Sequence, residues 1–278
     1  MDASSDRRLD ELIKFRLLLG KSGGFDVEHL MKDKPSSYLM YLHDNGDYST
    51  EILVYAKIGI HRYNMTHGKN LQLVSVEKYN FQPTPVYSCY YITLVAKDPD
   101  SGGSLVPFQA QVVEELYEIN KTLSCYIARP KFQPKEVEKP PVNQEPVDKS
   151  ILPEWPSENA FHDKSRYYLV KKSELQKYDW IRLYMKLAFL KANTKIKKPK
   201  LSRLVIVKVA VETDENVERP NERLNARNAT LYIKYKYRGP NKGRAGVCKA
   251  PRYRFAIVRR SINKNTGLLK LMFDNCLE

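Results

Sequence analysis

Basic side chains near the C-terminus have the types and spacing for binding anions. Lys234, Lys236 and Arg238 alternate along a predicted strand and so share one of its faces. Arg252 and Arg254 come early in the next predicted strand, where we expect them to lie across from the first three. Opposed like charges cost stability unless water or an anion covers them. This candidate basic face is therefore a solvated face, a surface for an acidic protein, or a nucleic-acid surface that contacts phosphates with little base reading.

A second basic cluster follows a predicted helix. Lys195, Lys197, Lys198 and Lys200 surround a proline, and residues 197–200 have the form of a nuclear localisation signal. The same lysines could instead form a solvated loop that neutralises the helix C-terminus. The first interpretation predicts an intracellular protein, in the nucleus rather than the cytoplasm.

Patterns that would indicate catalysis or metal binding are missing from the sequence. The five histidines show no HExxH spacing, the four cysteines form no CxxC pair, and there is no GxSxG. Residues 238–246 form a basic, glycine-bearing loop that lacks the Gly-Lys-Ser/Thr of a phosphate-binding loop. The sequence therefore predicts a protein that is not an enzyme and uses no cofactor or metal.

Charge is unevenly divided along the 278 residues, whose formal net charge is +15. Residues 1–150 hold 18 Lys and Arg against 20 Asp and Glu, whereas residues 151–278 hold 29 against 12. The basic half is expected to attract polyanions or acidic proteins. No apolar run approaches the ~20 residues of a membrane span, so none is predicted. The first residues lack the apolar stretch of a secretory signal, and reduced thiols are expected.

The elements that would position these residues begin with a helix over residues 49–66. Its apolar residues recur at i, i+3, i+4, i+7 and i+8, which is one face of a helix. Gly59 lies on that face, and a close approach to a sheet would compensate for its low helix propensity. Strands are predicted at 71–79, 89–96, 107–114 and 122–128, with an edge strand at 38–42 before the helix.

Prolines crowd residues 130–156 and predict a semi-rigid linker. After it, a short strand at 167–170 and a helix around Trp180 precede strands at 204–211, 230–237, 253–260 and 268–273. Val205, Val207, Val209 and Val211 are expected to share a face. The order of elements thus repeats that of the first half, which is a prediction of two similar units. The predicted division is 1–36 for an N-terminal helix and loop, 37–130 for unit 1, 131–160 for the linker and 161–278 for a basic unit 2.

A short strand, a long helix and a four-stranded meander are the arrangement of cystatins. The segments IHRYNMTHGKNLQLVSVEKYN, YYITLVAKDPD, LPEWPSENAF, KYDWIRLYMKLA and LNARNATLYIKY resemble those of the plant cystatin-related, male-sterility-five-type family of crucifers. The resemblance covers nearly the whole chain. It implies an α+β fold of two cystatin-like units, each a long helix packed on a curled antiparallel sheet of four to five strands. For some members it also implies roles in male reproductive development and meiosis.

The cystatin resemblance raises protease inhibition as one alternative. Cystatins inhibit papain-like proteases with an N-terminal glycine, a Gln-x-Val-x-Gly hairpin and a second hairpin with tryptophan, which allow close approach and supply apolar contact. The matching hairpin here reads Gln82, Pro83, Thr84, Pro85 and Val86, so only the glutamine fits the pattern. The second hairpin, 116–122, has no tryptophan, and Gly23 or Gly24 could serve as the glycine. We therefore expect residues 82–86 to be an interaction loop for an unidentified protein, with inhibition as an alternative.

The N-terminal residues 5–19 form an amphipathic helix candidate that ends at Gly20. It is too short to predict a coiled coil by itself. Packing on its own domain and binding to a partner, including self-association, are the two interpretations.

Overall fold

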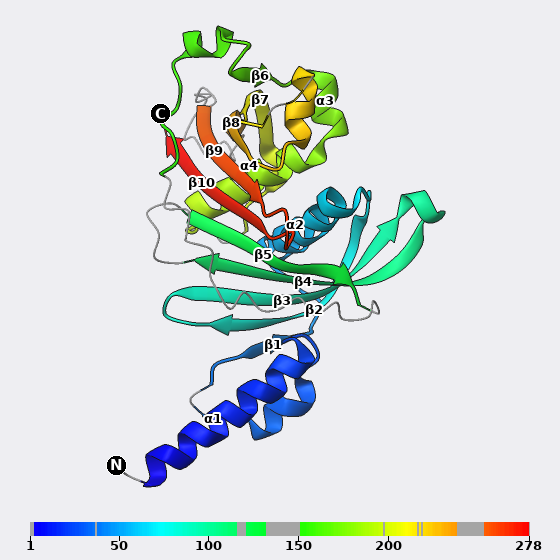
Figure 1. Cartoon of the computed structure of the whole chain (residues 1–278), viewed down its shortest axis with the longest axis vertical. Helices are drawn as coiled ribbons and strands as arrows, with labels where there is room; N and C mark the ends of the chain where they lie inside the picture. Colours follow the sequence, from blue (N-terminus) through cyan, green and yellow to red (C-terminus); the bar gives the residue numbers. More distant parts are fainter. Residues whose placement is uncertain are drawn as a thin grey trace, which may run out of the picture. The chain divides into compact units, whose positions relative to one another are not determined.

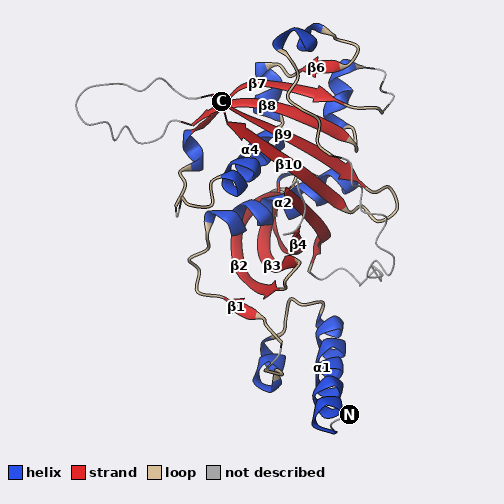
Figure 2. Ribbon diagram, turned by 90° about the vertical axis from the view of Figure 1, so that its left-hand side faces the viewer, coloured by secondary structure: helices blue, strands red, loops and turns tan. Residues whose placement is uncertain are grey.

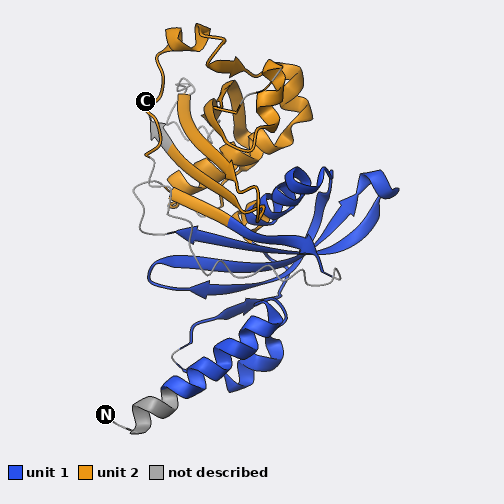
Figure 3. Cartoon of the chain, viewed as in Figure 1, with its two compact units in different colours: residues 1–48, 55–117, 125–134 blue, residues 49–54, 118–124, 135–278 orange. Residues whose placement is uncertain are grey.

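The computed structural model describes residues 3–36, 38–115, 121–131, 151–196, 198–215, 217, 219–237 and 253–277. The chain divides into two compact units (Figure 3). Unit 1 comprises residues 1–48, 55–117 and 125–134, and unit 2 comprises residues 49–54, 118–124 and 135–278. Both combine helices with antiparallel strands, which confirms the predicted mixture of helix and antiparallel sheet.

Unit 1 contains strands in the order β1-β2-β3-β4-β5 (Figure 1). They are β1 (Tyr41–His43), β2 (Gln72–Pro83), β3 (Tyr87–Asp98), β4 (Ser104–Glu115) and β5 (Lys121–Pro130), with a 3-10 turn, η2 (Pro99–Ser101), between β3 and β4. β5 belongs to unit 1 from Cys125 onward. The pairs β1–β2, β2–β3 and β3–β4 are antiparallel, and β1 is the edge strand predicted before the helix.

Helix α2 (Thr50–His67) covers one face of these strands, and its residues from Tyr55 onward belong to unit 1. The ring of Tyr55 lies 5.0 Å from that of Tyr90. A Cβ built on Gly59 would come within 2.4 Å of the Ala110 Cβ, well inside van der Waals contact. The predicted helix and the close approach at Gly59 are therefore both present.

The opposite face of the same strands carries the N-terminal segment. Helix α1 (Ala3–Ser22) leads through Gly23 and Gly24 to a 3-10 helix, η1 (Glu28–Asp33). Phe25 is fully buried, 5.5 Å from the ring of Tyr91. The Asn80 Nδ2 donates hydrogen bonds of 2.8 Å to the carbonyls of Gly24 and Phe25. A core cluster within this segment consists of Phe15, Leu19, Val27, Tyr38 and Met40, with Tyr91 of β3 packed against it.

Unit 2 contains strands in the order β10-β9-β8-β7-β6 (Figure 2). They are β6 (Tyr167–Leu169), β7 (Leu204–Glu212), β8 (Ala229–Tyr237), β9 (Tyr253–Ile262) and β10 (Leu269–Leu277), all paired antiparallel. Between β6 and β7 lie α3 (Lys172–Lys177), α4 (Asp179–Ala192) and η4 (Leu201–Arg203), and η5 (Pro220–Asn225) precedes β8. Each half of the chain thus has the predicted order of a short strand, helix and four strands.

The two faces of the unit 2 strands are covered differently. Helix α4 packs Phe189 against Tyr235 and Tyr237, with ring centroids 6.4 Å and 4.8 Å away. The other face carries residues 151–162, which we call the strap and which end in η3 (Glu158–His162). Its core cluster is Leu152, Phe161, Tyr167, Ala210, Tyr232, Ile257 and Met272, with Trp155 packed against it. Of the predicted linker, residues 132–150 lie outside the described residues, and residues 151–160 belong to the strap.

A buried arginine lies under the first turn of α4. The Arg260 side chain is fully buried, and its guanidinium lies 4.6 Å from the ring of Trp180. Its Nη2 donates a 3.0 Å hydrogen bond to the Leu224 carbonyl and a second to that of Ala226. Arg260 therefore ties η5 and the residue that follows it to β9.

Candidate functional site

The β2–β3 hairpin ends in the candidate interaction loop, Gln82–Val86, and its turn is ordered by one threonine. Thr84 Oγ1 donates to the Tyr87 carbonyl at 2.8 Å and accepts from the Tyr87 amide at 3.0 Å. The Thr84 amide donates to the same carbonyl at 2.9 Å. Pro85, Val86 and Tyr87 are exposed, and we call these three residues the tip patch. The loop thus presents apolar side chains on a fixed backbone.

Buried and half-buried side chains support the hairpin from the face that carries the N-terminal segment. The Tyr91 hydroxyl donates a hydrogen bond of 3.4 Å to Gln82 Oε1. Tyr38 also forms a hydrogen bond with Gln82, and burial raises the pKa of Tyr38 to about 12. Gln111 Nε2 donates to Cys89 Sγ at 3.3 Å, and burial raises the pKa of the Cys89 thiol. A buried thiol with a raised pKa is a poor nucleophile. The Cys89 thiol is therefore a structural group, and Gln82 ties the hairpin to Tyr38 and Tyr91.

Of the two glycines that could have served as an inhibitory N-terminus, Gly23 is half-buried and Gly24 is enclosed within unit 1. Gly24 is buried, and a Cβ built there would lie 2.3 Å from the ring of Tyr91. Its φ of +81° is one that side chains rarely adopt. Gly24 is thus required for packing against β3. Residues 116–120 of the second hairpin lie outside the described residues.

The candidate basic face is divided between two faces of the sheet. In the β8–β9 register Lys236 is opposite Tyr253, and Tyr235 is opposite Arg254. Since directly opposed residues share a face and successive residues alternate, Arg254 lies on the face away from Lys234 and Lys236. Its Nη1 donates to Asn193 Oδ1 at 2.9 Å. The prediction that Arg254 lies across from these lysines is therefore wrong, because Arg254 is opposite Tyr235, the residue between them. Arg238 and Arg252 lie outside the described residues.

The lysines of this face are partly neutralised by the strap. Glu158 accepts from Lys208 Nζ at 2.8 Å and from Lys234 Nζ at 3.2 Å, and these hydrogen bonds, that of Lys208 first, lower the pKa of the Glu158 carboxyl. Lys236 lies 4.6 Å from the centroid of the Tyr253 ring. Only part of the positive charge predicted for this face is therefore free of an acidic neighbour.

The second basic cluster lies between α4 and η4. Lys195, Lys198 and Lys200 are exposed, and Lys197 lies outside the described residues. At the other end of the chain, α1 buries Phe15 and Leu19 but leaves Leu9, Ile13 and Leu17 exposed.

Groups that could hold a metal ion do not gather anywhere in the part of the chain that the structure describes. In the same residues no helix is long and apolar enough to cross a membrane.

Sequence reasoning missed two features of unit 2. Strand β7 has an irregularity between Ile206 and Lys208, which shifts the pairing with β8 by one residue. Val205 and Val207 are therefore 37% and 44% exposed, whereas Val209 is buried, so the prediction of one shared valine face is wrong. The role of Glu158 was also missed, because it lies in a proline-bearing segment that was assigned to the linker.

The described residues thus form two α+β units, each combining helices with antiparallel strands. Residues 152–271 match the sequence model of the family described as Protein MS5. UPF0725 protein At4g17990 of Arabidopsis thaliana is 43% identical over 259 residues, which are 92% of this chain and 91% of that protein. An uncharacterized Arabidopsis protein, At4g17700, is 51% identical over 162 residues, covering 55% of this chain and 98% of its own length. The crystal structure of MS5 from Brassica napus matches with a TM-score of 0.67 and 35% identity, covering 84% of this chain and all of that one.

The chain belongs to the MS5 family, as its sequence resemblance predicted.

Proposed function

We propose that this chain is a non-enzymatic intracellular binding protein, built of two cystatin-like units, that acts through protein contacts in male reproductive development or meiosis. The observation that carries the proposal is the tip patch. Val86 is 55% and Tyr87 38% exposed on a turn that Thr84 holds in place. Exposed apolar and aromatic residues on a preorganised loop are suited to protein recognition. The role in reproduction rests on the family resemblance.

The test is co-purification of the tagged full chain from plant reproductive tissue. Val86→Asp places a charge in the tip patch, and Val74→Asp is the matched control because Val74 on β2 is 53% exposed. We expect the wild type and the Val74 variant to retain a common set of proteins that the Val86 variant loses. Equal retention by all three proteins would contradict the proposal.

Protease inhibition makes a different prediction for the same purified protein. A cystatin-type inhibitor needs a free N-terminal glycine, whereas Gly24 is enclosed against Tyr91. We therefore expect papain to keep its activity in a large excess of this chain. Stoichiometric inhibition that is lost on Val86→Asp would instead make the tip patch a protease-binding loop.

Nuclear localisation is a second part of the proposal. Lys195, Lys198 and Lys200 are exposed in a loop, where a transport receptor with an acidic groove could bind them. Replacing these three lysines with alanine in a fluorescent fusion of the full chain is expected to move the fusion from the nucleus to the cytoplasm. Replacement of the exposed Lys164, Lys171 and Lys177 is the control for loss of charge.

A further inference from the structure

The outer edge of β7 is only partly paired. The short strand β6 pairs with Ala210, Val211 and Glu212. Beyond β6, the Val170 amide donates a hydrogen bond of 3.0 Å to the Val209 carbonyl. For residues 204–208 the described part of the chain supplies no strand on this side. An unpaired strand edge is a template for another extended chain.

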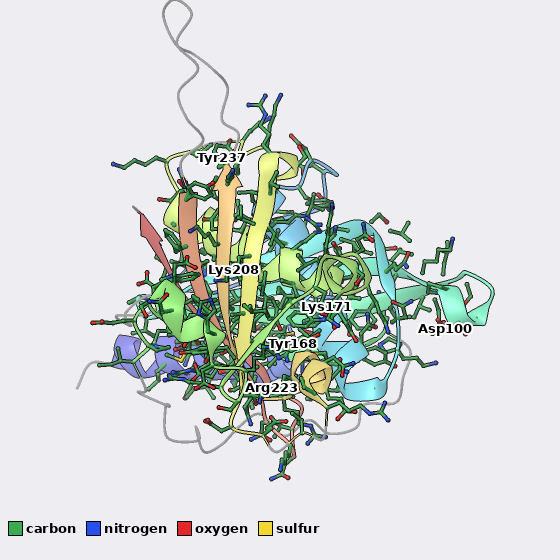
Figure 4. The ribbon with its side chains drawn as sticks, turned by 90° about the horizontal axis from the view of Figure 1, so that it is seen from above. Asp100, Tyr168, Lys171, Lys208, Arg223 and Tyr237 are labelled. Atoms are coloured by element: carbon green, nitrogen blue, oxygen red, sulfur yellow. The ribbon has the colours of Figure 1, made fainter. Side chains whose placement is uncertain are left out.

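A groove runs beside this free edge. It has a volume of about 320 Å³ and is bordered by β7, the end of β6, α3 and α4. Figure 4 looks down on this side of unit 2, with Lys171 and Lys208 labelled. Val170, Leu175 and Val205–Val207 give the groove an apolar lining. The volume is at the lower end of the range for ligand sites, so one or two side chains of a peptide would enter it.

The charged residues that line the groove are all basic. Lys172, Arg182 and Lys208 line it, and its lining includes no acidic residue. Lys208 is partly neutralised by Glu158, so Lys172 and Arg182 carry most of the free charge. The exposed Lys200 and half-buried Arg203 immediately precede β7. An acidic ligand is favoured by this arrangement.

We propose that the β7 edge binds an extended acidic peptide of a partner protein by strand addition. The backbone of the peptide would pair with residues 204–208, an apolar side chain would enter the groove, and its carboxylates would face Lys172 and Arg182. A second copy of this chain fits less well, because a symmetric pairing of two β7 edges would bring basic residues against basic residues. This surface lies on unit 2 and the tip patch on unit 1, so either can fail without the other.

The test uses the full chain and fluorescein-labelled peptides of alternating valine and threonine with two glutamates at each end. In an extended peptide, successive amides point to opposite edges. One isomer of the peptide therefore carries N-methyl groups on the amides of one edge, and a second isomer carries them on the amides of the other edge. Strand addition uses one edge only, so we expect one isomer to lose about tenfold or more in affinity and the other to stay within about threefold of the unmodified peptide. Equal binding of both isomers would indicate charge attraction alone and overturn the proposal, as would no binding at millimolar peptide.

Variants locate the binding on β7. Val207→Asp and Arg182→Glu are each expected to weaken binding about tenfold, whereas Val74→Asp is expected to leave it unchanged. Sedimentation without peptide tests the other occupant. If the chain dimerises, and if Val207→Asp makes it monomeric, the β7 edge binds a second copy of this chain. That result would overturn the proposal.

Discussion

The contact between α2 and β4 predicts an unusual response to a helix-stabilising substitution. Alanine in place of glycine at an exposed helix position stabilises by about 1 kcal/mol. At Gly59 the new Cβ would lie 2.4 Å from that of Ala110. Overpacking of this severity costs about 3 kcal/mol, so Gly59→Ala is expected to destabilise unit 1 by about 2 kcal/mol net.

A double-mutant cycle isolates this overlap. Ala110→Gly alone is expected to cost about 2 kcal/mol, from a lost buried methyl group and from glycine in a strand. With both substitutions the overlap is gone and the helix gain returns, so the pair should cost about 1 kcal/mol, a coupling of about 3 kcal/mol.

The assay must report on unit 1. Both tryptophans, Trp155 and Trp180, belong to unit 2, so hydrogen exchange of the β3 and β4 amides in increasing urea is the suitable measurement. Lys57→Ala, on the exposed side of α2, is the control and should change the free energy of unfolding by less than about 0.5 kcal/mol. If Gly59→Ala stabilises unit 1, or if the two substitutions are additive, the reasoning is refuted.

Two further predictions concern charged residues. Arg260→Met leaves the carbonyls of Leu224 and Ala226 without the donor that Arg260 Nη2 supplies, so the free energy of unfolding of unit 2 should fall by about 2–4 kcal/mol. Urea unfolding followed by the fluorescence of the neighbouring Trp180 measures this loss, and unchanged stability would contradict the role. Although burial alone would raise the pKa of Asp26 and of Glu28, hydrogen bonds from Lys78 lower both below their usual values. Their contribution to stability is then full above the unfolded pKa of about 4 and lost as the pH falls through the folded values. Protease cleavage at the N-terminal segment should therefore increase below about pH 4, and Lys78→Met should give the higher rate already at pH 7; a cleavage rate that is the same in both proteins at pH 7 would contradict this.

Local patterns sufficed for most of the helices and strands. The apolar period of residues 52–63 predicted α2 and its buried face, and Gly59 on that face predicted the close approach to a sheet. These features follow from short-range spacing, which the chain carries in its own sequence.

Features that depend on register could not be predicted in the same way. Whether Arg254 faces Lys236 or α4 depends on a shift of one residue in the β8–β9 pairing, and residue types alone do not specify that shift. The irregularity at Val207 likewise reverses the facing of Val205, and the partners of Glu158 lie about 50 residues or more away along the chain. Within the candidate site, the hairpin at residues 82–86 was predicted from the strands on either side and from the cystatin resemblance, but the burial of Gly24 against Tyr91 was not predicted.

Photo-crosslinking at the tip patch is the most direct test of the claim that this chain acts by binding a protein. A photoreactive amino acid replaces Val86 in the tagged full chain, or Val74 as the equally exposed control, and the tissue extract is irradiated. The account predicts a covalent adduct with a specific protein from position 86 and none from position 74. Equal adducts from both positions, or adducts from position 74 alone, would contradict it.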